Sequence, residues 1–249
     1  MAQWAATDSR DAWDGVGRTM DVFVTRTFLF VVLPVLLGVG IILFDPSARG
    51  GLRRSEALLV PLFVVGVAGS GIGGFIAHFF LSDEIAESIG WPTGSPFQLE
   101  VAFANLAMGI LGAIAADRRD GFREATVLAV TVFSVGATIV HLLDIQETGN
   151  LSPGNTIQNV SNLLRPALLI ALLIASRRSE RGPEEPPDLD AFDRWRAPLV
   201  HASVVAVVLV SSAFAVGFAT GQTVAVSALG AAVACAAFAV ILVRDRSNA

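Results

Sequence analysis

Seven apolar stretches, each about as long as a bilayer is thick, dominate this sequence of 249 residues. A hydrocarbon core of about 30 Å is crossed by about 20 helical residues. Every backbone polar group in lipid must be satisfied within the protein, which favours helices. We therefore expect an all-α, polytopic membrane bundle of about seven transmembrane helices. The expected spans are 22–44, 57–81, 97–116, 124–143, 157–175, 198–219 and 223–243.

The arginines indicate which way the chain runs through the membrane. All seventeen basic residues are arginine, and thirteen of them follow the first, third, fifth and seventh spans. The connections after the second, fourth and sixth spans contain none. Because basic residues are retained on the cytoplasmic side, we expect the N-terminus outside and the C-terminus in the cytoplasm of a multi-pass protein of the cell membrane.

The apolar runs and their connections divide the chain into five parts. Residues 1–21 form a polar arm, and 22–44 the first transmembrane helix. Residues 57–175 are expected to form a four-helix membrane core. The proline-rich and acidic stretch 176–197 reads as a cytoplasmic linker, and 198–243 as a C-terminal transmembrane hairpin.

Composition excludes several classes of function. Hydrophobic residues make up 53% of the chain, charged residues 16%, and the net charge is -5. A lipid bilayer is therefore the expected partner, and a nucleic acid is excluded because no basic surface is available for phosphates. A retinal protein is excluded because there is no lysine for a Schiff base. The single cysteine, Cys235, rules out a disulfide framework.

Small residues and helix signals predict some local structure. Residues 69–74 read Gly-Ser-Gly-Ile-Gly-Gly inside an apolar run, which favours close packing of a neighbouring helix. A short amphipathic helix is expected from Ser82, ending at Gly90. Ser95 and Gln98 are spaced as a capping box that starts the third span. Ser152, followed by a proline, is expected to start the fifth span.

Ionisable residues inside spans are costly and mark candidate sites. His78, Glu100 and His141 are all expected near the outer end of a span, with Asp144 on the same helix face as His141. In the fifth span, polar side chains recur every three or four residues and so share one face. This polar stripe consists of Asn155, Asn159, Asn162 and Arg165. Only His201 is expected near the cytoplasmic face.

The spacing of these residues leaves several kinds of chemistry open. His78, Glu100 and His141 could hold a divalent metal, two histidines could ligate haem, or the set could relay protons. Arg165 with the polar stripe could bind an anionic or carbonyl-bearing ligand. Structural alternatives are an Arg165–Glu100 ion pair and Gln98 acting only as a helix cap.

A resemblance to a known group of proteins rests on several short motifs. They are His-Phe-Phe at 78–80, Ile-Ala-Glu-Ser-Ile-Gly-Trp-Pro at 85–92, Gly-Ser-Pro-Phe-Gln at 94–98, Glu100, Gly136 with His141, and Gly-Asn at 149–150 with Pro-Gly-Asn at 153–155. These resemble an uncharacterised family of small bacterial and archaeal membrane proteins over residues 57–175. The resemblance implies a four-helix membrane core and no activity. Its motif positions here are His78, Glu87, Trp91, Gln98, Glu100, His141 and Asn155.

These observations favour binding over catalysis. We expect a small ligand or ion in an outer-leaflet polar pocket enclosed by spans two to five, formed by His78, Gln98, Glu100, His141 and the polar stripe. Transport or sensing would be its output. The alternatives are a metal-dependent membrane enzyme using two histidines and one glutamate, and a structural scaffold whose polar residues fix helix register.

Overall fold

The computed structural model describes residues 21–180 and Val216, and every element in 21–180 is helical. Five helices in this part of the chain are long and apolar enough to cross a membrane, so the protein is a multi-pass membrane protein. They are Asp21–Phe44, Gly51–Phe80, Phe97–Asp117, Gly121–Thr148 and Pro153–Glu180. The two further expected spans, 198–219 and 223–243, lie outside the described residues, as do the 1–20 arm and His201.

Several of these helices are divided by changes in winding. Asp21–Phe44 contains the π-helical turn η1 (Phe28–Val32) and then α2 (Leu33–Phe44). Gly51–Phe80 comprises α3 (Gly51–Pro61), the π-helical η3 (Leu62–Gly69) and α4 (Ser70–Phe80). Pro153–Glu180 comprises α8 (Pro153–Thr156) and α9 (Gln158–Glu180), so the fifth helix continues past the expected linker start at residue 176.

The remaining elements are α6 (Phe97–Asp117), α7 (Gly121–Thr148) and two short connections. The 3-10 turn η2 (Pro46–Arg49) joins α2 to α3, and α5 (Ser82–Ile89) follows α4. Two of the expected helix ends are confirmed, whereas the expected capping box of Ser95 and Gln98 is not, because Pro96 precedes α6 and makes no side-chain cap hydrogen bond. Gly90 ends α5 with a positive φ of 80°, and Ser152 is the residue before α8. A positive φ costs glycine little, which is why it suits this position.

The helix Gly51–Phe80 forms the centre of the bundle. All eight residues of η3 are buried, and Leu59, Leu62 and Phe63 are fully inaccessible. The hydrophobic cluster around them reaches from Leu29 in η1 to Leu169 in α9. The first helix therefore packs into the same core as the four that follow it.

Glycine allows α6 to pack backbone against backbone on both α4 and η3. A Cβ atom on Gly71 would lie 2.5 Å from the nitrogen of Gly109, and one on Gly112 would lie 2.7 Å from the side chain of Val67. Neither separation can be accommodated without a shift of the helices. The expectation that residues 69–74 mediate close helix packing is confirmed.

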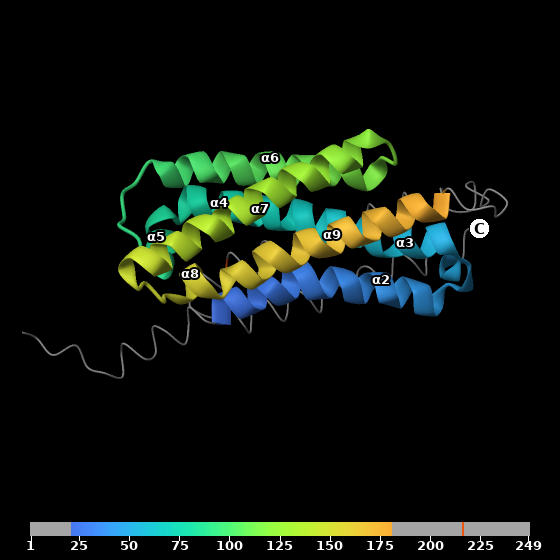
Figure 1. Ribbon diagram of the computed structural model, residues 1–249, viewed down its shortest axis with the longest axis horizontal. Coiled ribbons are helices and arrows are strands. Elements are labelled where there is room, and N and C mark those ends of the chain that lie inside the picture. The colour runs from blue at the N-terminus through green and yellow to red at the C-terminus, as the bar shows by residue number, and fades with distance from the viewer. Residues whose placement is uncertain (1–20, 181–215, 217–249) are drawn as a thin grey trace, which may run out of the picture.

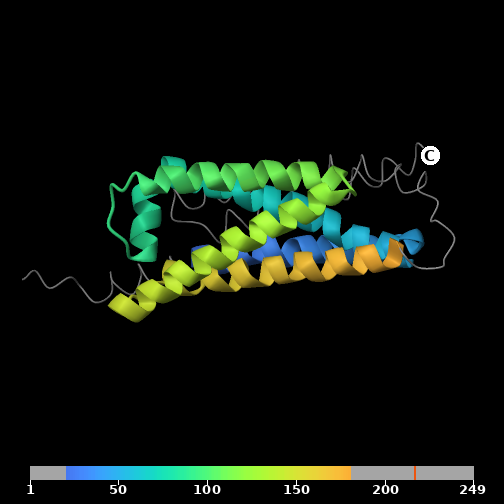
Figure 2. The ribbon, with the colours of Figure 1, turned by 45° about the horizontal axis from the view of Figure 1, so that its top comes forward.

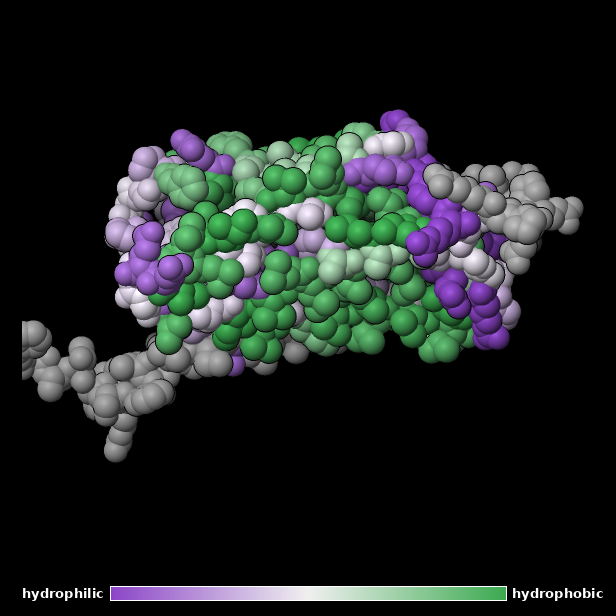
Figure 3. Space-filling view, in the orientation of Figure 1, coloured by the Kyte–Doolittle hydropathy of each residue, from purple (hydrophilic) through white to green (hydrophobic). Residues whose placement is uncertain are grey.

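The long axis of the bundle separates polar ends from an apolar belt. Figure 3 shows hydrophilic residues gathered at both ends and hydrophobic residues between them. The arginine-bearing connections after α2 and α6 and the last turn of α9, with Arg177 and Arg178, all lie at one end, and α5 and α8 lie at the other (Figure 1). Figure 2 shows α7 crossing the bundle obliquely, from its junction with α6 towards α8.

Candidate ligand-binding cavity

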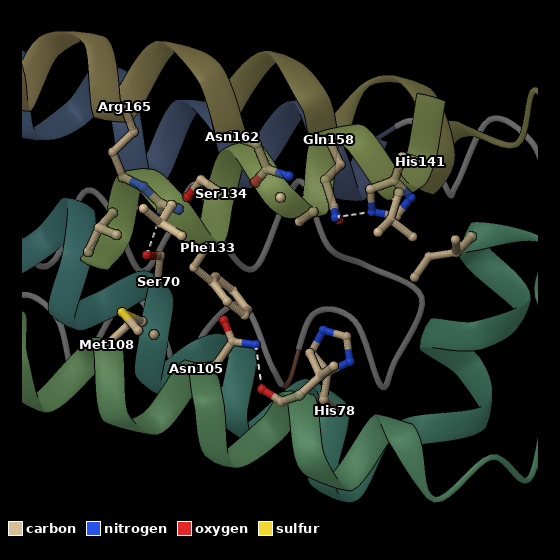
Figure 4. A pocket seen from close by; sticks show the side chains of 18 of the residues that line it. Ser70, His78, Asn105, Met108, Phe133, Ser134, His141, Gln158, Asn162 and Arg165 are labelled. Carbon is tan, nitrogen blue, oxygen red and sulfur yellow. Dashed lines mark hydrogen bonds between the residues drawn. The ribbon is translucent and has the colours of Figure 1, made fainter. Parts of the chain in front are cut away.

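A cavity of about 320 Å³ lies between α4, α6, α7 and α9, in the half of the bundle nearest α5 and α8 (Figure 4). It extends from His78, near the end of α4, to Arg165, whose partner Gly66 lies near the middle of the helix Gly51–Phe80. The cavity therefore runs from one end of the bundle to about half its depth.

Arg165 forms the deep end of this cavity. Its Nη1 donates to the carbonyl oxygen of Gly66 at 3.0 Å and to the hydroxyl of Ser70. Gly66 belongs to the π-helical η3, and π-helical turns recur at functional sites. Among the described residues, the buried Nε of Arg165 has no hydrogen-bond partner, and Nη2 has none either. No residue of the described part of the chain therefore binds the Nε–Nη2 edge of the guanidinium.

Two more polar groups beside Arg165 have no hydrogen-bond partner within 21–180. The side-chain nitrogen of Asn162 and the hydroxyl of Ser134 are both buried, and both residues line the cavity (Figure 4). Each can donate a hydrogen bond. Leaving a buried polar group unpaired costs about 1–3 kcal/mol, so these three residues form a site that favours hydrogen-bond acceptors.

A chain of hydrogen bonds runs from Arg26 to Asp144. Arg26 Nη1 donates to Gln158 Oε1 at 3.1 Å, and Gln158 Nε2 donates to His141 Nε2 at 2.9 Å. His141 Nδ1 in turn donates to Asn155 Oδ1 at 2.7 Å, and Asn155 Nδ2 donates to Asp144 Oδ2 at 2.8 Å. Every donor faces an acceptor, with a cation at the donor end and a carboxylate at the acceptor end.

This chain of hydrogen bonds fixes the protonation state of His141. The ring is neutral with its proton on Nδ1, because Nε2 accepts from Gln158 and Nδ1 donates to Asn155. Both ring nitrogens are thus engaged and neither offers a free lone pair to a metal ion. Trp91 stacks on the ring with centroids 5.3 Å apart and donates Nε1–H to Asp144 at 3.1 Å.

His78 makes a separate contact across the cavity. Its Nδ1 lies 2.6 Å from Oε1 of Gln98, and Gln98 is only 4% exposed. The expectation that Gln98 only caps its helix is therefore wrong. α6 begins instead with the backbone nitrogen of Phe97 donating to the hydroxyl of Ser95 at 3.3 Å.

Glu100 does not join the two histidines. It is exposed, and it does not line the cavity. Two residues span about 200° around a helix, so a buried Gln98 turns Glu100 away. Among residues 21–180 no three histidine, cysteine or acidic side chains form a group that could hold a metal. The Arg165–Glu100 pair is absent for the same reason.

The polar stripe of the fifth span is placed on one buried face. Asn155, Asn159, Asn162 and Arg165 are each at most 9% exposed. Only Asn162 and Arg165 line the cavity. Asn155 belongs to the hydrogen-bond chain, and Asn159 donates to the carbonyl oxygen of Asn155 at 3.0 Å.

The sequence reasoning missed several residues of the cavity. Arg26, within the first apolar helix, could have been found as a charge inside a span. Ser70, Ser134 and Gln158 carry no such signal, because neutral polar side chains are ordinary in helices. No aspartate or glutamate is among the described residues that line the cavity, which has two arginines.

A buried ion pair at the opposite end of the bundle was also missed. Glu56 Oε1 accepts from Arg123 Nη1 at 2.6 Å, and the two residues are 1% and 2% exposed. Arg123 also donates to the carbonyl oxygens of Ala115 and Ala116. The sequence alone indicates only His201 near the cytoplasmic face and does not identify this pair.

Comparison with known proteins gives a family and no activity. No curated protein and no solved structure matches the chain. A family sequence model matches residues 24–182, which is wider than the expected 57–175 and includes the first helix with Arg26. Because the match covers well over half of the chain, the protein belongs to DUF6790, a family of unknown function.

Proposed function

We propose that the protein binds a small ligand carrying a carboxylate or a similar anionic group in the cavity between α4, α6, α7 and α9. Transport or sensing would be the output of this binding. The arginine distribution supports a seven-span topology in the cell membrane, with the cavity in the outer leaflet, the N-terminus outside and the C-terminus in the cytoplasm.

One observation carries the proposal: two arginines face a cavity whose described lining contains no acidic residue. Arg165 and Arg26 make no ion pair with any described residue. Arginine remains charged inside proteins, and a charge withdrawn from water is stabilised by a counter-charge. An anionic ligand would supply that counter-charge.

The unpaired donors support a particular binding geometry. The free Nε–Nη2 edge of Arg165 presents two parallel N–H groups, which match the two oxygens of a carboxylate. Asn162 and Ser134 would donate to the remaining acceptor positions. Arg26, held by Gln158, would add a second positive charge, and His78 and Gln98 would line the path nearer the end of α4.

The proposal is tested by titrating purified protein in detergent with hexanoate, and with hexanol as the uncharged control. Hexanoate is expected to raise the melting temperature, because a ligand that binds the folded state stabilises it. Hexanol is expected to have no such effect. In Arg165→Gln the response to hexanoate should disappear, and in Arg165→Lys it should weaken, because lysine lacks the planar fork.

Arg54→Gln is the matched control, because Arg54 is exposed and does not line the cavity. It should respond as the unaltered protein does. If neither hexanoate nor the longer decanoate binds in a manner that depends on Arg165, the proposal fails. A lower melting temperature of Arg165→Gln together with no ligand effect in any variant or in the unaltered protein would favour the scaffold alternative.

A further inference from the structure

Three of the four sides of the cavity are closed by contacts between its helices. α4 and α6 pack so closely that a Cβ on Gly71 would lie 2.5 Å from a backbone nitrogen of α6. The hydrogen bond between His141 and Gln158 joins α7 to α9. Arg165 joins α9 to Ser70 on α4. In the part of the chain that the structure describes, the remaining side lies between α6 and α7.

This remaining side is bordered by apolar residues. α6 and α7 meet at residues 118–120 and then separate, because α7 crosses obliquely towards α8 (Figures 1 and 2). Cavity-lining residues on both helices have exposed side chains: Phe97 is 52%, Val132 65% and Val140 50% exposed. They belong to membrane-spanning segments, so we infer that this side faces hydrocarbon chains.

The cavity combines two chemical environments. Its deep end has the cationic edge of Arg165 and the donors of Asn162 and Ser134. Its walls along α6 and α7 are largely apolar and include Val101, Met108, Val130, Phe133 and Ala137. A purely polar anion would leave these walls without contacts, and a hydrocarbon would leave the donors unpaired. A molecule with a carboxylate and an aliphatic chain matches both.

We propose that the ligand is a single-chain amphiphile with a carboxylate headgroup, which enters from the bilayer between α6 and α7. The carboxylate binds the free edge of Arg165, and the chain lies along the walls formed by α6 and α7. This proposal rests on the function proposed above and adds the ligand class and the route. Each methylene buried against the walls tightens binding about fourfold relative to the aqueous monomer.

The aliphatic chain is tested by comparing hexanoate with decanoate. The protein is embedded in lipid nanodiscs, and calorimetric titrations into empty nanodiscs are subtracted to remove partitioning into lipid. Decanoate should bind more tightly, by about fourfold for each added methylene that the walls cover. Equal affinity of the two acids would overturn the proposed chain site and leave anion binding intact. Tighter binding of decyl phosphate than of decanoate would overturn the carboxylate headgroup.

The route is tested at Gly136, which lines the cavity on α7 and has no neighbouring atom within 4 Å of the position that a Cβ would occupy. A leucine side chain there fills open space at the chain path. Gly136→Leu should weaken decanoate binding about tenfold or more, because its side chain displaces two or more methylenes from the walls. Hexanoate, which is held mainly by Arg165, should bind nearly unchanged.

Gly40→Leu is the matched control, since Gly40 also has open space around its Cβ position and does not line the cavity. It should bind both acids as the unaltered protein does. Equal decanoate binding by the two leucine variants would overturn the route.

The position of the aliphatic chain can also be measured in the unaltered protein, with a decanoate that carries a diazirine at the end of its chain. This photolabel should react with peptides of α6 and α7. Labelling confined to other helices would overturn the proposal.

Discussion

The buried carboxylate of Glu56 is surrounded by partners from two other helices. Arg123 on α7 and Ser176 on α9 donate to its Oε1 at 2.6 Å and 3.2 Å. Glu56→Ala would leave Arg123 buried without its counter-ion, and breaking a buried pair from one side costs about 3–5 kcal/mol. We expect a loss of that size in the free energy of unfolding, measured by denaturant titration of the protein in detergent.

An exposed ion pair at the same end provides the comparison. Arg177 and Glu124 lie 2.6 Å apart, with side chains that are 26% and 45% exposed. Pairs in contact with water contribute about 0–1 kcal/mol, so Glu124→Ala should change the unfolding free energy by no more than that. Equal losses in Glu56→Ala and Glu124→Ala would show that burial does not decide the strength of these pairs.

Asp120, in the connection between α6 and α7, gives the protein a pH dependence. The hydrogen bond from Arg118 and the backbone N–H of Phe122 lower the pKa of Asp120 from 3.8 to about 2. A carboxylate with a lowered pKa stabilises the folded state above its unfolded pKa, and this stabilisation is lost as the pH falls through the folded pKa. The loss is therefore expected between about pH 4 and about pH 2.

The measurement compares melting temperatures of the unaltered protein and Asp120→Asn across this range. Asparagine still accepts the hydrogen bond at the start of α7 but has no charge for Arg118. The unaltered protein should be the more stable at about pH 5, and the difference should shrink towards about pH 2. A difference that is constant with pH would contradict the role of the Asp120 charge.

Single residues were predictable where a helical period fixed their direction. The stripe from Asn155 to Arg165 recurs every three or four positions, and all its members are buried. Glu100 was misplaced because one charge in a span has no period, and only the packing of Gln98 against α4 decides its direction. Ser134 and Ser70 became relevant only once Arg165 was seen beside them.

At the scale of elements, the contact between η3 and α6 depends on the absence of side chains. A Cβ on Gly112 would lie 2.8 Å from the backbone nitrogen of Ala68, which cannot move independently. Gly112→Ala should therefore destabilise the protein by about 1–3 kcal/mol, the range for overpacking. Denaturant titration in detergent measures this difference.

Gly40→Ala is the control variant, and it is expected to change the stability in the opposite direction. Gly40 lies in α2 with nothing within 4 Å of its Cβ position. Alanine is favoured over glycine in a helix by about 1 kcal/mol, so this variant should be slightly more stable than the unaltered protein. If both alanine variants stabilise the protein, close packing of α6 against η3 is contradicted.

Two helix ends were predictable, and helix winding was not. Glycine, proline and serine specify the ends chemically: Gly90 ends α5, and Ser152 with Pro153 begins the fifth helix. The π-helical segments η1 and η3 have no comparable signature, because a wider turn depends on what packs against it. η3 supplies the Gly66 carbonyl oxygen that binds Arg165, so this part of the cavity could not be derived from the sequence.

At the scale of the whole molecule, the alternation of arginines along the sequence predicts that one end of the bundle is richer in arginine than the other, and the bundle has this arrangement. The connections at 45–50 and 118–120 and the end of α9 lie together, and the end with α5 and α8 is opposite (Figure 1). The proposed cavity opens within the half nearer α5 and α8. The direction of the bundle in the membrane therefore decides from which leaflet a ligand enters.

The direction is tested with single cysteines in a Cys235→Ser background. Thr93, between α5 and α6, and Ser47, between α2 and α3, are both exposed and lie in connections at opposite ends of the bundle. Because arginines are retained in the cytoplasm, a membrane-impermeant maleimide should label Thr93→Cys in intact cells. It should label Ser47→Cys only after the membrane is permeabilised. The reverse pattern would place the cavity in the cytoplasmic leaflet, and labelling of both cysteines in intact cells would contradict a membrane-spanning bundle between them.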